Sequence, residues 1–102
     1  MAIEFRLIDV SQRNKTNYAP QPGKYLYKDQ IQFSGNVKAA YVSLCGFTCI
    51  SDSPMKEIGI RAYGKPMPEN KSLVEVQIIA NGANDDKSFY GDIEYTVIAE
   101  LE

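Results

Sequence analysis

The sequence predicts an all-β protein, a six-stranded antiparallel β-sandwich. The first observation is strict alternation of apolar and polar residues late in the chain, as LVEVQIIA at 73–80 and FYGDIEYTVIAEL at 89–101. A period of two is typical of strands that bury one face and expose the other. The second is the recurrence of turn residues every roughly 10–15 residues, which is typical of a sandwich or small barrel. The third is the absence of a long amphipathic helix pattern.

Size and composition predict one domain that spans residues 1–102. The chain is 44% hydrophobic and 24% charged, which is ordinary for a globular protein. Its length allows one modest core, and a core this small favours an oligomer. The net charge is −2, with charges of both signs interspersed and no basic stripe, so we expect no nucleic-acid partner.

No window approaches the roughly 20 apolar residues that span a bilayer, so we expect no membrane insertion. The start, MAIEFRLIDV, lacks the basic and apolar regions of a secretory signal. The cell compartment is therefore not specified by the sequence. The default expectation is a cytoplasmic protein, or one released by a non-classical route.

The first third of the chain predicts two strands and a long loop. Residues 2–10 alternate between apolar and charged side chains and predict the first strand. Residues 11–24 are polar and contain two prolines and a glycine, which predicts a surface loop of a length often associated with function. Residues 25–33 predict the second strand, with a bulge near Asp29.

The longest apolar run is VKAAYVSLCGFTCI at 37–50, after a turn at 34–36. Its β-branched and aromatic residues favour a strand over a helix. Both faces are mostly apolar, which predicts a central strand. Gly46 indicates a bulge or a close approach of another backbone. In a regular strand, one face carries Tyr41, Ser43, Cys45, Phe47 and Cys49.

The rest of the chain predicts three strands joined by turns and loops. SDSP at 51–54 predicts a turn or a single helical turn, and IGIRAY at 58–63 predicts the fourth strand. GKPMPEN at 64–70 predicts a proline-rich loop. The last two strands are predicted at 73–80 and 92–101, on either side of a loop rich in Asn, Gly and Asp.

The two cysteines are not expected to form a disulfide. On one regular strand, the Cα atoms of Cys45 and Cys49 lie about 13 Å apart, and a disulfide needs about 4.4–6.8 Å. The chain has no third cysteine and no histidine to complete a zinc site. We therefore interpret both residues as small thiols of the core.

The sequence argues against an enzyme. Without histidine, neither a Ser-His-Asp nor a Cys-His nucleophile system can form. Neither a phosphate-binding loop nor a dinucleotide fingerprint is present. Carboxylates cluster late in the chain, but a glycosidase needs two of them about 5–10 Å apart across a deep cleft. A sandwich of this size has little room for such a cleft. The late carboxylates are Asp85, Asp86, Asp92 and Glu94.

The first candidate binding site is the loop before the last strand. It brings the polar side chains of Asn81, Asn84, Asp85 and Asp86 close to Tyr90 in the sequence. Such acceptors suit a polar ligand, although Asn and Asp are also common in solvated hairpin loops. The loop lacks the spacing and the closing Glu of an EF-hand. Calcium is therefore a weaker alternative, and we predict no cofactor.

The second candidate site is Arg61 with Tyr63. In a strand these two side chains point to the same face. The planar guanidinium of an arginine can hold a hydroxyl-rich or anionic ligand. The alternative is an edge-strand arginine that pairs with a surface carboxylate.

Two N-glycosylation sequons begin at Asn14 and Asn70, both in predicted loops. Because such short motifs arise often by chance and no signal sequence is visible, we interpret them as coincidence.

Several segments together resemble the H-type lectin domain over roughly residues 25–101. They are IQF at 31–33, AYVSLCGF at 40–47, IRAYG at 60–64, VEVQI at 74–78 and FYGDIEYTVIAEL at 89–101. That family is a six-stranded antiparallel β-sandwich of similar length. Its members assemble as trimers, sometimes stacked into hexamers, and bind galactose or N-acetylgalactosamine at subunit interfaces. The resemblance implies a glycan ligand and a homotrimer or hexamer here.

The resemblance also implies site residues. The family's sugar-contacting arginine in the fourth strand matches Arg61. Its polar loop position matches Asp85 or Asp86, and the tyrosine after that loop matches Tyr90. The family's stacking tryptophan is absent, so Tyr90 or Tyr63 would take its place. We therefore predict a lectin-like module, and the alternative is a structural or oligomerisation domain of a phage-tail or toxin-complex type.

Overall fold

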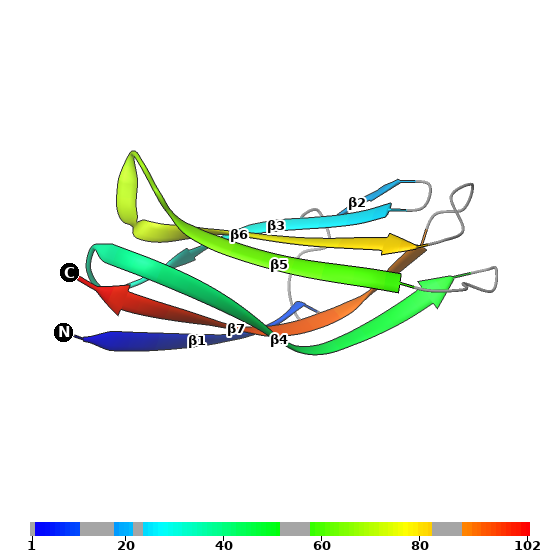
Figure 1. The fold of residues 1–102 in the computed structure, drawn as a ribbon, viewed down its shortest axis with the longest axis horizontal. Helices are drawn as coiled ribbons and strands as arrows, with labels where there is room; N and C mark the ends of the chain where they lie inside the picture. Colours follow the sequence, from blue (N-terminus) through cyan, green and yellow to red (C-terminus); the bar gives the residue numbers. More distant parts are fainter. Residues whose placement is uncertain (1, 11–17, 22–23, 52–57, 83–88) are drawn as a thin grey trace.

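The protein is a two-layered β structure in the computed structural model (Figure 1). Its strands are β1 (Ile3–Asp9), β2 (Tyr18–Gln21), β3 (Lys24–Gln32), β4 (Val37–Ser51), β5 (Ile58–Met67), β6 (Asn70–Gly82) and β7 (Phe89–Leu101). A three-stranded sheet has the order β1-β7-β4, and a four-stranded sheet has the order β2-β3-β6-β5. All strand pairs are antiparallel. The structure describes residues 2–10, 18–21, 24–51, 58–82 and 89–102, with side chains at 2–10, 26–48, 59–81 and 92–102.

The predicted all-β antiparallel sandwich is confirmed. Six long strands lie in two sheets, and β2 adds a strand of four residues at the edge of the larger sheet. This short strand falls inside the segment 11–24, so the prediction of a continuous loop there is wrong. The reason is that residues 18–21 continue the backbone ladder along β3. The alternation of apolar and polar residues gives no sign that this short segment pairs with β3.

The core lies between the two sheets and follows the alternation of β6 and β7. In each of these strands every second residue is fully buried, and its neighbours are more exposed. Both strands are central in their sheets, and the opposite sheet covers their inner faces. The buried residues are Val10, Tyr27, Ile31, Phe33, Val37, Val74, Val76, Ile78, Ala80, Ile93, Tyr95, Val97 and Ala99.

A pair of tyrosines joins the two sheets inside the core. The rings of Tyr27 and Tyr95 are 5.8 Å apart in an edge-to-face arrangement, and their hydroxyl oxygens are 3.2 Å apart. The Tyr27 hydroxyl also donates a hydrogen bond of 2.9 Å to Asp29. Asp29 thus stays in an unbroken register between β3 and β6. The predicted bulge near Asp29 is wrong, because hydrogen bonds accommodate this carboxylate within the regular strand.

The predicted irregularity near Gly46 is confirmed. The register of β4 against β7 shifts between Leu44 and Gly46, which leaves Cys45 as the extra residue of a bulge. The bulge changes which residues face the core. Both Leu44 and Phe47 pack against the core, whereas Tyr41 is exposed. The prediction that Phe47 shares a face with Tyr41 is therefore wrong.

Two further predictions for β4 are wrong. β4 is an edge strand of its sheet, because the strand order is β1-β7-β4. Its outward side chains, such as Tyr41, lie on the surface. Cys45 lies on that surface as an exposed free thiol, and its Sγ is 3.3 Å from the Oγ1 of Thr96. It is therefore not a core thiol. The side chain of Cys49 lies outside the described residues.

The predicted loop 64–70 is mostly strand. β5 continues to Met67, a turn of two residues follows, and β6 begins at Asn70. Pro66 is compatible with this strand because β5 is at the sheet edge, where one side of the backbone needs no partner. Gly64 lets the sheets approach, since a Cβ there would lie 2.7 Å from a methyl group of Val42.

The first strand exposes its apolar residues. Ile3, Phe5 and Leu7 point away from the core, with exposed fractions of 56%, 62% and 69%. The polar residues between them point inward to the edge of the core. This orientation is the reverse of what the alternation alone would suggest.

The inward residues of β1 have specific partners. Glu4 accepts hydrogen bonds from the backbone N–H and the hydroxyl of Ser34, at 2.9 and 2.7 Å. The backbone donor of Ser34 is the main cause that lowers the pKa of Glu4, and its hydroxyl and Arg6 act in the same direction. The Arg6 guanidinium lies 4.8 Å from the centre of the Phe33 ring. These contacts account for the reversed orientation.

Candidate functional site

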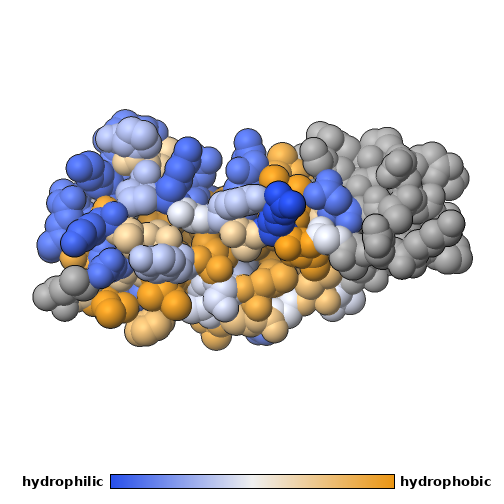
Figure 2. Space-filling view, in the orientation of Figure 1, coloured by the Kyte–Doolittle hydropathy of each residue, from blue (hydrophilic) through white to orange (hydrophobic). Residues whose placement is uncertain are grey.

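The outer face of the four-stranded sheet carries a group of polar side chains. They come from three neighbouring strands, because each outward residue of β6 has register partners on both β3 and β5. The cross-strand rows are Leu26–Ile79–Arg61, Lys28–Gln77–Tyr63 and Gln30–Glu75–Lys65. We refer to Lys28, Gln30, Arg61, Tyr63, Lys65, Glu75 and Gln77 as the polar face. In Figure 2, hydrophilic residues gather on the upper side of the molecule, where Figure 1 places β3, β5 and β6.

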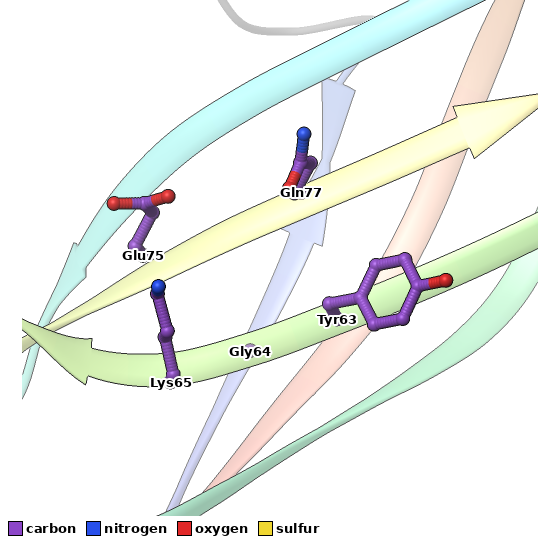
Figure 3. A pocket seen from close by; sticks show the side chains of 5 residues that line it. All are labelled: Tyr63, Gly64, Lys65, Glu75 and Gln77. Atoms are coloured by element: carbon purple, nitrogen blue, oxygen red, sulfur yellow. The ribbon is translucent and has the colours of Figure 1, made fainter.

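A shallow depression lies on the polar face between β5 and β6. Its volume is about 380 Å³, and it is lined by Tyr63, Gly64, Lys65, Glu75 and Gln77. Figure 3 shows the four side chains rising from the two strands around Gly64. Because the side of Gly64 that could carry a Cβ faces the core, its backbone forms the floor of the depression.

A second depression adjoins the first. It has a volume of about 500 Å³ and is lined by Lys28, Asp29, Gln30 and Glu75. Glu75 lines both depressions, so they form one continuous polar surface across β3, β6 and β5.

The chemistry of the polar face suits hydrogen bonding to a polar ligand. Gln77 offers both a donor and an acceptor, Glu75 offers acceptors only, and Lys65 offers donors only. Tyr63 has an exposed fraction of 47%, so its ring is available for apolar contact beside these groups. Ligand sites typically combine such an apolar surface with a few convergent polar groups.

The structure brings two of the predicted site residues together. Arg61 and Tyr63 are both exposed and lie on the same face of β5, separated by the inward residue Ala62. Asn81 is exposed at the end of β6, between Lys24 and Gly59 in the register. It lies on the same outer face as Gln77, four residues further along the strand.

The other predicted site residues are not placed. Asn84, Asp85 and Asp86 lie outside the described residues. The backbone of Tyr90 belongs to β7, opposite Ile50, and its side chain lies outside the described residues. The proximity of the loop to Tyr90 therefore stays a prediction.

Three side chains that line the depression were not predicted as site residues from the sequence. Glu75 and Gln77 stand on the wet face of the alternating run 73–80, and that alternation is a signal that could have found them. Lys65 lies in the segment predicted as a loop. No local signal shows that β5 continues to this residue.

A metal centre is not evident in the part of the chain that the structure describes. Among those residues, no group of three or more His, Cys, Asp or Glu side chains could hold a metal ion. Within the same ranges, no helix is long and apolar enough to cross a membrane.

Comparison with known proteins gives no match to a family model, to a curated protein or to a solved structure. The resemblance to the H-type lectins therefore stays a prediction.

Proposed function

We propose that this protein is a non-catalytic module that binds carbohydrate on the polar face. The observation that supports this most is the open depression of about 380 Å³, in which Tyr63 lies beside Lys65, Glu75 and Gln77. The preference for galactose or N-acetylgalactosamine follows from the resemblance to H-type lectins. The proposed site keeps Arg61 and Tyr63 and adds neighbours on β5 and β6.

In this proposal each polar group has a definite task. Glu75 accepts hydrogen bonds from sugar hydroxyls, and Lys65 donates to them. Gln77 can do both, which suits a hydroxyl that donates and accepts at once. Tyr63 supplies an apolar ring against the C–H side of the sugar. Arg61 lies two residues from Tyr63 on the same face of β5, and it donates hydrogen bonds to a second sugar ring or to a substituent of the first.

Affinity at a single site is expected to be weak. The depression is shallow and Tyr63 stays partly exposed, so little of a sugar would be removed from water. Several copies held together would raise the overall avidity without any new contact.

A second candidate function is that of a structural or oligomerisation domain in a larger assembly. The observation that favours it is the group of exposed apolar side chains on the three-stranded sheet: Ile3, Phe5, Leu7 and Tyr41.

A glycan array tests the proposed function. We expect the purified protein to bind terminal galactose-type glycans and Tyr63→Ala to reduce that binding at least about tenfold. Glu75→Gln should weaken binding, because it replaces a carboxylate acceptor with an amide. The matched control is Glu69→Gln, in the exposed turn of the same β5–β6 hairpin, which should bind as the wild type does.

Two results would contradict the proposal. A folded wild-type protein that binds no glycan would leave the oligomerisation domain as the better reading. Glycan binding that survives Tyr63→Ala unchanged would show that the polar face is not the site.

A further inference from the structure

A group of apolar side chains, most of them exposed, lies on the outer face of the three-stranded sheet, whose neighbouring rows also carry Thr96, Ser43 and Glu100. Its central row joins Phe5, Ile98 and Tyr41 across β1, β7 and β4. Ile3 and Leu7 lie on either side of Phe5 along β1. We refer to these five residues as the apolar face. In Figure 2, hydrophobic residues gather on the side of the molecule where Figure 1 places these strands.

This exposure is fixed by the contacts on the other side of β1. Glu4 is held by two hydrogen bonds from Ser34, and Arg6 lies over the ring of Phe33. Turning β1 over would bury its apolar residues but would break these contacts and expose Phe33. The fold therefore presents Phe5 and Leu7 to the outside as part of its stable arrangement.

The exposed apolar area matches the need of a stable homodimer. Phe5 and Tyr41 have exposed fractions of 62% and 60%, which corresponds to roughly 100–150 Å² each. With Ile3 and Leu7 at similar fractions, the total is roughly 400 Å² or more. A standard interface buries about 800 Å² per partner, and about 65% of a homodimer interface is apolar. That gives an apolar share of about 500 Å² per partner.

We propose that two copies of this chain associate back to back through the apolar face. Sheets that pack face to face lie about 10 Å apart, with strand directions within about 30°. A two-fold axis parallel to β7 lays β1 of each copy over β4 of the other. Phe5 then meets Tyr41 of the second copy, and the contact occurs twice because the interface is isologous.

Two carboxylates lie on the outer side of β7, on either side of Ile98. Glu94 pairs with Gly46, four residues from Ile98, and can stay hydrated at the rim of the dimer. Glu100 lies in the row next to Ile98, between Ile3 and Ala39, so the two-fold axis brings it opposite Glu100 of the second copy and its charge opposes the association. The two polar faces point outward in this arrangement, so both stay accessible. The association does not depend on whether the polar face binds sugar.

Sedimentation of the wild-type protein over a concentration series is the first test. We expect a dimer, and we expect Tyr41→Lys to raise its dissociation constant at least about 30-fold, as for a central interface residue. The matched control is Tyr63→Lys, which places the same charge on the other sheet and should leave the dimer intact. Tyr41 and Tyr63 are both surface residues, so we expect both variants to fold, and circular dichroism checks this.

A second measurement needs no variant. Cys45 lies on the outer side of β4 and is exposed in the single chain. In the dimer it lies near the second copy, so its alkylation, followed by mass spectrometry, should slow as protein concentration rises. Alkylation at an unchanged rate in a species that sediments as a dimer would overturn the proposed interface.

Oligomeric states other than a dimer would also support or overturn the proposal. A hexamer that Tyr41→Lys splits would support the two-fold contact. A trimer that this substitution leaves intact would overturn it, because a face-to-face isologous contact does not occur between subunits of a simple ring of three. A monomer at high concentration would also overturn it. A monomer that binds phosphatidylcholine vesicles through Phe5 and Leu7 would assign the face to lipid instead.

Discussion

The outer faces of the two sheets have opposite chemistry, although both sheets bury their inner faces in the same core. Among the side chains that the structure describes, each outer face carries one exposed tyrosine. Tyr63 lies opposite Gln77 in a polar row, whereas Tyr41 lies opposite Ile98 in an apolar row. Because the core already satisfies the inner faces, folding does not dictate the composition of the outer ones. This difference is the basis of the two proposed uses, a hydrated site for polar ligands and a surface that associates with a second copy.

The two faces also differ in what holds them in place. The polar face rests on β6, whose inner residues are fully buried. The apolar face includes β1, an edge strand positioned by the polar contacts of Glu4 and Arg6.

The largest expected effect comes from changing the distance between the two sheets. Gly64→Val places a branched side chain where even a Cβ lies 2.7 Å from Val42. We expect a loss of about 1–3 kcal/mol in the free energy of unfolding, as for overpacked cores. The measurement is urea denaturation.

The control for this substitution is Gly59→Val on the same strand. A Cβ at Gly59 has no neighbour within 4 Å among the described contacts, so we expect little or no loss of stability. Equal losses at both positions would show that the effect comes from the strand backbone rather than from the distance between the sheets.

A smaller loss of stability is expected from a substitution in the tyrosine pair that joins the sheets. Tyr27→Phe keeps the ring but removes the hydroxyl that contacts Tyr95 and donates to Asp29. We expect a loss of about 1–2 kcal/mol in the free energy of unfolding, because a part-buried carboxylate loses a donor. Tyr63→Phe, on the polar face, should change stability by less than about 0.5 kcal/mol. Similar values for both substitutions would argue against a role for the buried hydroxyl.

Salt should distinguish the apolar face from a charged interface. Raising NaCl from about 0.05 M to 1 M shortens the range of electrostatic interactions to about 3 Å. We expect dimerisation to strengthen by a few-fold, because salt screens the repulsion between the two Glu100 side chains that face each other across the two-fold axis. In Glu100→Gln the salt effect should shrink. Sedimentation at the two salt concentrations measures this, and a dimer that dissociates at high salt would contradict an apolar contact.

The smallest effect concerns the contact that orients β1. The pKa of Glu4 is lower in the folded protein than in the unfolded chain, mainly because Ser34 donates to its charged form. Its stabilising contribution is therefore present above the pKa of Glu4 in the unfolded chain and is lost as the pH falls through its lower pKa in the folded protein. Glu4→Gln should reduce stability slightly at pH 7 and should flatten the decline on acidification.

Thermal unfolding between pH 7 and pH 2 measures this effect. Ser34→Ala removes the hydroxyl donor but keeps the backbone donor, so we expect an intermediate pH dependence. An unchanged acid slope in Glu4→Gln would assign that slope to other carboxylates.

Much of the fold follows from local pattern. Alternation, together with the apolar β-branched and aromatic run at 37–50, located the six long strands, and Gly46 indicated the bulge of β4. The same alternation placed Arg61 and Tyr63 on one face. These predictions succeed because successive side chains of a regular strand point to opposite faces, so every second residue lies on the same face.

The failures share a different cause. The short strand β2, the continuation of β5 to Met67 and the edge position of β4 all depend on which backbone lies alongside. Lys65 was not identified as a site residue for this reason. A pairing partner leaves no periodic signal in the strand's own sequence, whether it is near, as β3 is to β2, or far, as β7 is to β4.

The sequence by itself determined that this protein is built of strands and where most of them lie, because a period of two requires only local geometry. It also determined that each strand has two chemically distinct faces, apart from β4. Only the tertiary structure decided which face of β1 turns inward, since that depends on Ser34 and Phe33, about thirty residues away. It likewise assembled the polar face from three strands and the apolar face from three others, because a surface is made by neighbours in space.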